Sequence, residues 1–174
     1  MPAHNHLPPH LVGMRALSIM QPWAGLIVLS AVDGMFKRVE NRTWPAPAAM
    51  LGRRFVIHAS ARPDPDCREY GPRGAAIDVI ADQIAWCAAS ISSKRFDAAL
   101  ARIPHAFACG AILGTAVLSG CTQDDTDPWA MPKREHWHLG DVQALLSGPI
   151  PYKGALGFWT VRGVAQERAP ERVG

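Results

Sequence analysis

The sequence predicts a mainly β domain with helical insertions, an α+β chain whose strands close into a small barrel. Segments in which apolar and polar residues alternate, such as 53–60, are typical of strands with two distinct faces. Glycine and proline mark the corners between such segments. Many strands, few helices and no internal repeats together favour a small closed barrel.

Length and composition predict one domain with an ordinary packed core. The chain has 174 residues, of which 48% are hydrophobic and 19% are charged. Its formal charge of +3 permits contact with phosphates without requiring it. We expect a disordered tail over 1–14, a domain over 15–165 with a helical insert at about 63–103, and a polar tail over 166–174.

The first part of the domain should hold three strands and one helix. Residues 15–20 alternate in the manner of a strand, and a proline ends it. Residues 23–32 are apolar on nearly all sides, which predicts a buried helix. Residues 37–44 and 53–60 read as the second and third strands, and in the third Arg54 and His58 share one face.

The helical insert separates these strands from a second block. Residues 63–74 are polar and rich in turn formers, 75–90 carry apolar residues at helical spacing, and 95–101 suggest a further short helix. Residues 108–121 then predict a long central strand, bent or bulged near its two internal glycines.

The last part of the domain should contain two short strands around an irregular corner. Residues 137–139 predict a short strand, and 141–146 a helical turn capped by Asp141. Prolines and glycines then form the corner, and 158–164 predict the closing strand.

Several protein classes are excluded or disfavoured. No two of the four cysteines form a C-x-x-C pair, and His136 and His138 are too few for a closed site, so we expect no metal and no cofactor. The first ten residues lack the charged and apolar regions of a signal peptide, which predicts a cytoplasmic protein with reduced thiols. The longest apolar runs are too short to span a membrane.

The densest group of chemically active side chains lies in 34–44, where Lys37, Glu40 and Arg42 fall within six positions. A carboxylate between two cations stays ionised and can accept a hydrogen bond from the edge of a base. An arginine can bind phosphate or base acceptors, and a desolvated lysine can act as base or nucleophile. Spacing alone favours a different interpretation, a surface ion-pair ladder worth about 0–1 kcal/mol per pair.

The pattern Gly34-x-x-Lys37-x-x-Glu40-x-Arg42 resembles the G-x-K-x-x-E-x-R signature of the ASCH superfamily, with one extra residue after the glycine. Four other segments are similar to segments of the same domain in the same order. The resemblance covers about 15–164 and departs from the family over 63–103. The four segments are 17–24, 52–60, 137–139 and 151–159.

This resemblance implies a PUA-like β-barrel with an RNA-binding cleft. It also implies a second activity, because some small ASCH proteins are amidohydrolases that remove the acyl group from N4-acetylcytidine. Their catalytic lysine corresponds to Lys37, whereas their neighbouring threonine is replaced here by Glu40. Their further catalytic glutamate has no match in this chain, although a pair of lysine and carboxylate could still carry out related chemistry.

The remaining candidates surround this motif. Trp23 and Trp44 could each stack on a base, although Trp23 could equally fill the core. His58 could contact a base or transfer a proton, or it could be a core histidine bonded to backbone. The predicted binding residues are Gln21, Pro22, Trp23, Lys37, Glu40, Arg42, Trp44, Arg54 and His58, with Lys37 and Glu40 catalytic if the protein is an enzyme.

Three functions follow from these residues. The first is a module that binds single-stranded or modified RNA, or a modified nucleoside, because RNA is usually read at unstacked bases. The second is a hydrolase of a modified nucleoside amide, with Lys37 as base or nucleophile. The third is a protein-interaction adaptor, which would need an exposed apolar patch, and the helical insert is the place for one.

Overall fold

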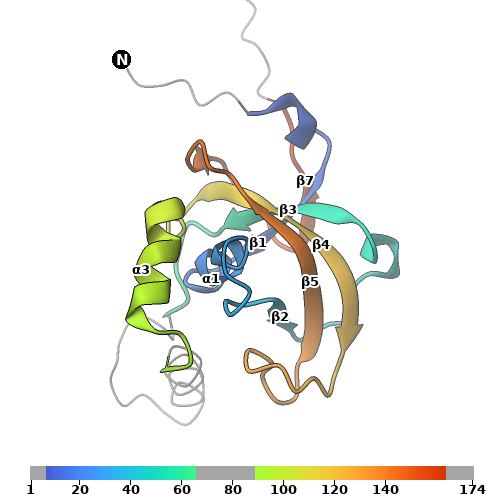
Figure 1. The fold of residues 1–174 in the computed structure, drawn as a ribbon. Coiled ribbons are helices and arrows are strands. Elements are labelled where there is room, and N and C mark those ends of the chain that lie inside the picture. The colour runs from blue at the N-terminus through green and yellow to red at the C-terminus, as the bar shows by residue number, and fades with distance from the viewer. Residues whose placement is uncertain (1–6, 66–88, 164–174) are drawn as a thin grey trace, which may run out of the picture.

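The computed structural model describes residues 7–65 and 89–163, and they form a curled sheet packed around one buried helix (Figure 1). The sheet has seven strands in the order β2-β5-β4-β3-β1-β7, with β6 paired to β4. The elements are η1 (Pro9–Leu11), β1 (Arg15–Ile19), α1 (Trp23–Leu29), β2 (Val39–Arg42), η2 (Ala48–Met50), β3 (Arg54–Ala59), α3 (Ser93–Arg102), β4 (Ala111–Thr122), β5 (Glu135–Ala144), β6 (Ile150–Pro151) and β7 (Phe158–Thr160).

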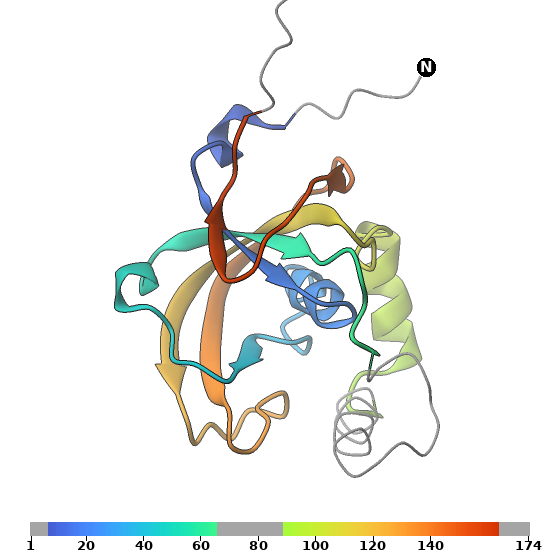
Figure 2. The same cartoon turned by 180° about the vertical axis from the view of Figure 1, so that it is seen from behind.

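The sheet is mixed and curls into a half-barrel, so the expectation of a mainly β fold is confirmed. Strand β1 pairs with both neighbours, running parallel to β3 and antiparallel to β7. Figure 2 shows these strands from the side opposite to that of Figure 1. Strands β2 and β7 are the two edges of the described sheet, so hydrogen bonds do not close it into the predicted complete barrel. Instead the ring of Phe158 in β7 stacks on that of Trp137 in β5, with centroids 5.7 Å apart.

The alternation in β3 is confirmed, and both of its faces are buried. Phe55, Ile57 and Ala59 point into the main core, while Val56 joins a smaller cluster on the opposite side of the sheet. A period of two necessarily sends successive side chains to opposite faces. Two separate cores therefore hold the sheet from both sides.

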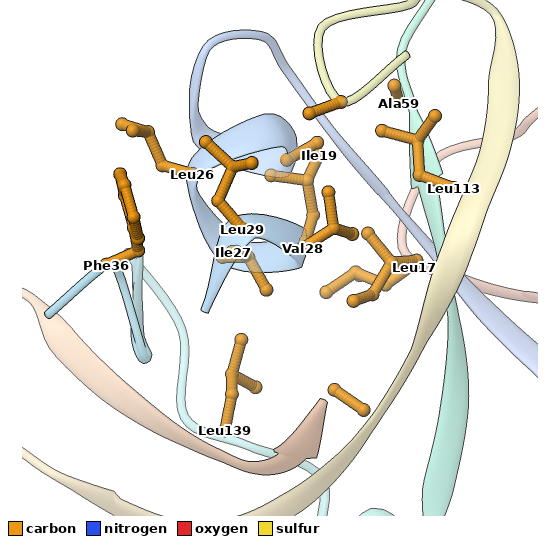
Figure 3. Packing of buried hydrophobic residues seen from close by; sticks show 14 of the residues in the cluster. Leu17, Ile19, Leu26, Ile27, Val28, Leu29, Phe36, Ala59, Leu113 and Leu139 are labelled. Atoms are coloured by element: carbon orange, nitrogen blue, oxygen red, sulfur yellow. The ribbon is translucent and has the colours of Figure 1, made fainter. Parts of the chain in front are cut away.

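Helix α1 fills the hollow side of the sheet. It ends at Leu29, three residues before the predicted end at 32, and every one of its residues after Trp23 is buried. Figure 3 shows Leu26 to Leu29 surrounded by apolar side chains of the strands, among them Leu17, Leu113 and Leu139. This burial on all sides is what a helix without a polar face requires.

The expected helical turn over 141–146 is wrong, because β5 continues to Ala144. The irregularity in the sequence marks a bulge: Gly140 and Gln143 face Val117 and Thr115 of β4, which leaves two residues of β5 opposite one of β4. Asp141 lies in this bulge with φ of +42°. Pairing with β4 therefore overrides the local preference of the segment for a helical turn.

The segment before β1 belongs to the folded domain from residue 7 onward, which differs from the expected tail over 1–14. Leu11 is fully buried in the smaller cluster, and the Gly13 N–H donates to the Val161 carbonyl at 2.8 Å. The burial of Leu11 and the backbone hydrogen bond to Val161, just after β7, hold this segment in place. Residues 1–6 and the expected tail over 166–174 lie outside the described residues.

Of the predicted insert at 63–103, the structure describes residues 63–65 and 89–103. Helix α3 confirms the helix expected at 95–101 and extends it at both ends, beginning after Ser92, whose hydroxyl accepts from the Arg95 N–H. The Arg95 guanidinium also binds Asp33 through two contacts of 2.6 Å, which joins α3 to the segment after α1. The predicted helix at 75–90 falls almost entirely outside the described residues.

None of the helices in the described ranges has the length and apolar character that crossing a bilayer requires.

Candidate functional site

A hollow of about 420 Å³ lies beside β2, and it brings together five of the predicted binding residues. These are Trp23 at the start of α1, Lys37 just before β2, Glu40 and Arg42 within β2, and Trp44 just after it. The volume falls within the range of about 300–1,000 Å³ typical of small-molecule sites. Aromatic faces and charged groups therefore share one concave surface.

Glu40 lies between the two cations of the motif. Its carboxylate is 3.1 Å from Arg42 Nε and 3.9 Å from Lys37 Nζ. The Arg42 contact is electrostatic, because Nε is not aligned for a hydrogen bond. The opposite charges on both sides offset the cost of burying this carboxylate. A carboxylate has room for further hydrogen bonds, so it can still accept from a ligand.

Lys37 is the deepest of the charged groups, with only 1% of its surface exposed. Its ammonium group donates to the Val39 carbonyl and lies 5.3 Å from the centre of the Trp23 ring. These contacts explain why a lysine is tolerated there. Lys37 therefore forms part of the wall of the hollow and lies beside Glu40.

Arg42 reaches the hollow from β2 with most of its hydrogen-bonding capacity available. Its Nη2 donates to the Ser18 carbonyl at 3.2 Å, and its guanidinium lies 5.8 Å from the centre of the buried Trp137 ring. The planar fork of arginine has several other N–H donors that can bind acceptors of a base or a phosphate.

Trp44 presents a rigid aromatic surface to the hollow. Its ring packs edge-on against Trp137 with centroids 4.6 Å apart, and the Trp137 indole N–H donates to the Trp44 carbonyl at 3.2 Å. Trp137 is itself fully buried and stacked on Phe158. A column of aromatic rings, formed by Trp137 and Phe158, thus supports Trp44. This support reduces the side-chain entropy that Trp44 would lose when a ligand stacks on it.

Trp23 is half-buried and is bound to a residue that sequence reasoning missed. Its indole N–H donates to Asp64 Oδ2 at 2.9 Å, and the Asp64 N–H donates to the Gln21 carbonyl at 2.7 Å. Asp64 also lines the hollow. It falls in the stretch that was expected to be only a polar link, and no local pattern distinguishes it.

Asn41 was also missed, although it lies inside the motif. Its side-chain NH₂ donates to the Trp129 carbonyl at 2.9 Å, and its Oδ1 accepts from the Met131 N–H at 2.9 Å. These two bonds fasten the loop between β4 and β5 to β2. The loop brings Met131 and Arg134 to the hollow. Its position between two charged residues of the motif was the sequence signal that could have identified it.

Gln21 and Pro22 support the site without lining it. The Gln21 side-chain NH₂ donates to the carbonyls of Ala106 and Ala108 at 3.0 and 2.8 Å, and its Oε1 accepts from the Gly25 N–H at 2.9 Å. This buried amide joins the start of α1 to the segment after α3. Pro22 directly precedes the helix, in the position where a missing N–H costs nothing.

Arg54 and His58 are not brought to the hollow. Arg54 pairs with Asp141 of the β5 bulge and donates to Thr115 Oγ1 at 2.9 Å. His58 is buried with Nε2 2.9 Å from the Tyr152 carbonyl and Nδ1 3.1 Å from Ser18 Oγ. Burial lowers the pKa of His58. The structure thus places His58 as a core histidine bonded to backbone, the second of its two expected roles.

Metal-ligand groups and similarity to known proteins are two further sources of functional information. Within residues 7–65 and 89–163, no group of three or more His, Cys, Asp or Glu residues is placed to hold a metal ion. No protein-family model matches the chain, and no curated protein matches it either.

Proposed function

We propose that this protein binds an unpaired nucleobase of single-stranded or modified RNA, or of a modified nucleoside, in the hollow beside β2. The observation that carries the proposal is the position of the supported Trp44 ring beside Glu40 and Arg42 on one concave wall. A flat aromatic face can stack on a base, and the two charged groups offer an acceptor and donors to its edge.

The resemblance to the ASCH superfamily supports the same proposal from the sequence side. All three charged residues of the motif line the hollow, as residues of a shared binding signature should. A curled mixed sheet with a central helix is also compatible with a PUA-like domain in a cytoplasmic RNA-binding protein. Membership of that superfamily and the PUA-like fold are part of this proposal.

A second candidate is a hydrolase of a modified nucleoside amide, and the proximity of Lys37 to Glu40 favours it. The two groups are 3.9 Å apart at the wall of the hollow. However, a lysine must lose its proton to act as base or nucleophile, and an adjacent carboxylate favours the charged ammonium form. The contact between Lys37 and the Val39 carbonyl also engages the ammonium group. Binding is therefore the function that this geometry supports better.

The first experiment measures RNA binding by Trp44→Ala and a charge control. Fluorescence anisotropy with a short single-stranded RNA should show that Trp44→Ala weakens binding by about 1–3 kcal/mol, the usual value of one stacked base. Arg42→Gln should also weaken binding. Arg53→Gln, an exposed change of the same charge that does not line the hollow, should have a much smaller effect. Equal affinities for Trp44→Ala and the wild type would contradict the proposal.

The second experiment separates binding from catalysis. The wild type is incubated with a panel of modified cytidines, including N4-acylcytidines, and the products are analysed by mass spectrometry. The binding proposal predicts saturable binding without product. Release of the acyl group, lost in a folded Lys37→Met variant of similar side-chain length, would instead select the hydrolase.

A further inference from the structure

A second hollow of about 410 Å³ adjoins the first one. The two hollows share Arg42, Thr43 and Arg134 in their walls. The second hollow is completed by Gln123, Lys133 and Glu135, at the end of the β4–β5 hairpin. A ligand that occupies the first hollow can therefore extend directly into the second.

The wall of the second hollow is positively charged. Arg42, Lys133 and Arg134 are its cations, and Glu135 is the carboxylate among the described lining residues. That carboxylate is engaged elsewhere, because its Oε1 accepts from Gln123 Nε2 at 2.6 Å and its Oε2 from Cys121 Sγ at 3.4 Å. The two cations from the hairpin are exposed, and neither forms an ion pair with a described residue.

The segment that carries these cations is held in place before any ligand binds. Lys133 has φ of +59°, a left-handed conformation that few residues other than glycine adopt. The preceding turn is fixed on both sides at Met131, whose N–H donates to Asn41 Oδ1 at 2.9 Å and whose carbonyl lies 2.7 Å from His136 Nε2. A loop anchored to both β2 and β5 loses less entropy when an anion binds.

We infer that the second hollow is a phosphate subsite, which binds a phosphate attached to the nucleoside whose base occupies the first hollow. This inference rests on the proposed function. One arginine can bind two phosphate oxygens at once through its planar guanidinium, and a lysine adds a mobile positive charge. Neighbouring backbone and amide groups complete such sites. The ligand class is therefore a nucleotide or a segment of an RNA strand, rather than a free nucleoside.

The experiment compares the four ribonucleosides with their 5′- and 3′-monophosphates by calorimetry at low salt. The wild type should bind at least one monophosphate about tenfold more tightly than its nucleoside, as expected for charge-assisted hydrogen bonds. The double variant Lys133→Asn/Arg134→Gln, called the hairpin variant, should lose most of this advantage, measured in each protein as the ratio of monophosphate to nucleoside affinity. The ratio is used because Arg134 also lines the first hollow. Asparagine is chosen because it tolerates the left-handed backbone of residue 133.

The matched control is Lys94→Gln/Arg102→Gln, which removes two exposed positive charges from α3, a helix that lines neither hollow. It should keep the full phosphate advantage. A ten-residue single-stranded RNA distinguishes the source of the phosphate: if the strand is the ligand, the salt dependence of RNA binding should be shallower in the hairpin variant than in the control.

Three results would overturn the inference. If nucleosides bind the wild type but a phosphate adds nothing, or if the hairpin variant keeps the full advantage, the subsite is wrong while base binding stands. If neither nucleosides, monophosphates nor RNA bind the wild type, base binding and the subsite fail together.

Discussion

His58 shows how the surroundings of one side chain decide its role. Because a carbonyl can only accept, the contact with Tyr152 places the ring hydrogen on Nε2, and Nδ1 then accepts from the Ser18 hydroxyl. The same hydroxyl accepts from the Trp159 indole N–H at 3.1 Å. A Cβ at Gly154 would collide with both the imidazole and the hydroxyl, so this glycine lets the backbone cover them. The neutral imidazole thus links three strands and a loop.

This arrangement predicts that stability decreases as the pH falls below about 6.5. The pKa of His58 is lowered from its ordinary value of 6.5, chiefly because burial disfavours the charged ring. The unfolded chain therefore takes up a proton at this site at a higher pH than the folded protein does. Because the unfolded state then holds more protons, the free energy of unfolding decreases as the pH is lowered through this range.

The measurement is urea unfolding at about pH 7.5 and about pH 5.5, for the wild type and His58→Asn. The variant should be less stable at the higher pH, because it loses the hydrogen bonds of the buried ring. Its stability should also change less between the two pH values. Equal pH dependence in the two proteins would show that His58 does not contribute to it.

At the scale of elements, strand β2 and the β4–β5 hairpin build the site together. Strand β2 pairs with β5 in antiparallel register, which places Glu40 opposite Trp137 and Arg42 opposite Glu135. Asn41 then fastens the loop of the hairpin to the same strand through two hydrogen bonds. One short strand therefore positions the charged motif, the aromatic column and the cationic loop relative to one another.

We predict that Asn41→Leu releases the loop while the sheet stays folded. Two hydrogen bonds of about 0.5–1.5 kcal/mol each are lost, and the amide of Met131 loses its acceptor. Hydrogen exchange should become faster at residues 129–134 and stay unchanged in β3 and β4. RNA affinity should fall as well, because Arg134 is no longer held at the hollow.

Gln143→Leu provides the matched control for this prediction. It replaces an exposed amide of the neighbouring strand that lines neither hollow. Exchange in the loop should match the wild type in this control. If Asn41→Leu also leaves exchange at 129–134 unchanged, the two hydrogen bonds do not fasten the loop.

At the scale of the whole molecule, two cores on opposite faces of the sheet hold the half-barrel together. The main core encloses α1, and the smaller core lies under η1 and the segment after β7. Leu11 contributes from η1 to the smaller core, next to Val56 and Ile112 of the central strands. Residues before β1 therefore stabilise the sheet from the face opposite to α1.

Leu11→Ala should lower the free energy of unfolding by about 2–5 kcal/mol, because a fully buried leucine is replaced by a cavity. Thermal and urea unfolding measure this loss. Leu156→Ala, at a position that is 98% exposed, should change stability little and serves as the control. A Leu11 variant as stable as this control would mean that the segment before β1 does not contribute to the fold.

The features that the sequence predicted correctly are those with a local physical cause. The two faces of β3 follow from the period of two, and the complete burial of α1 follows from its lack of a polar face. The grouping of Lys37, Glu40 and Arg42 at one hollow follows from their closeness along the chain. Each of these statements needs only neighbouring residues and the geometry of one element.

Other features depended on contacts between distant parts of the chain. Trp23 binds Asp64, 41 residues away, and Asn41 binds the Trp129 carbonyl, 88 residues away. The bulge at Asp141 and the burial of Leu11 likewise depend on partner strands that no local pattern reveals. Motif and periodicity therefore specified the chemistry and the faces of the elements, whereas tertiary pairing decided which side chains share the hollow, because hydrogen bonds and apolar burial form only where the folded chain brings their partners together.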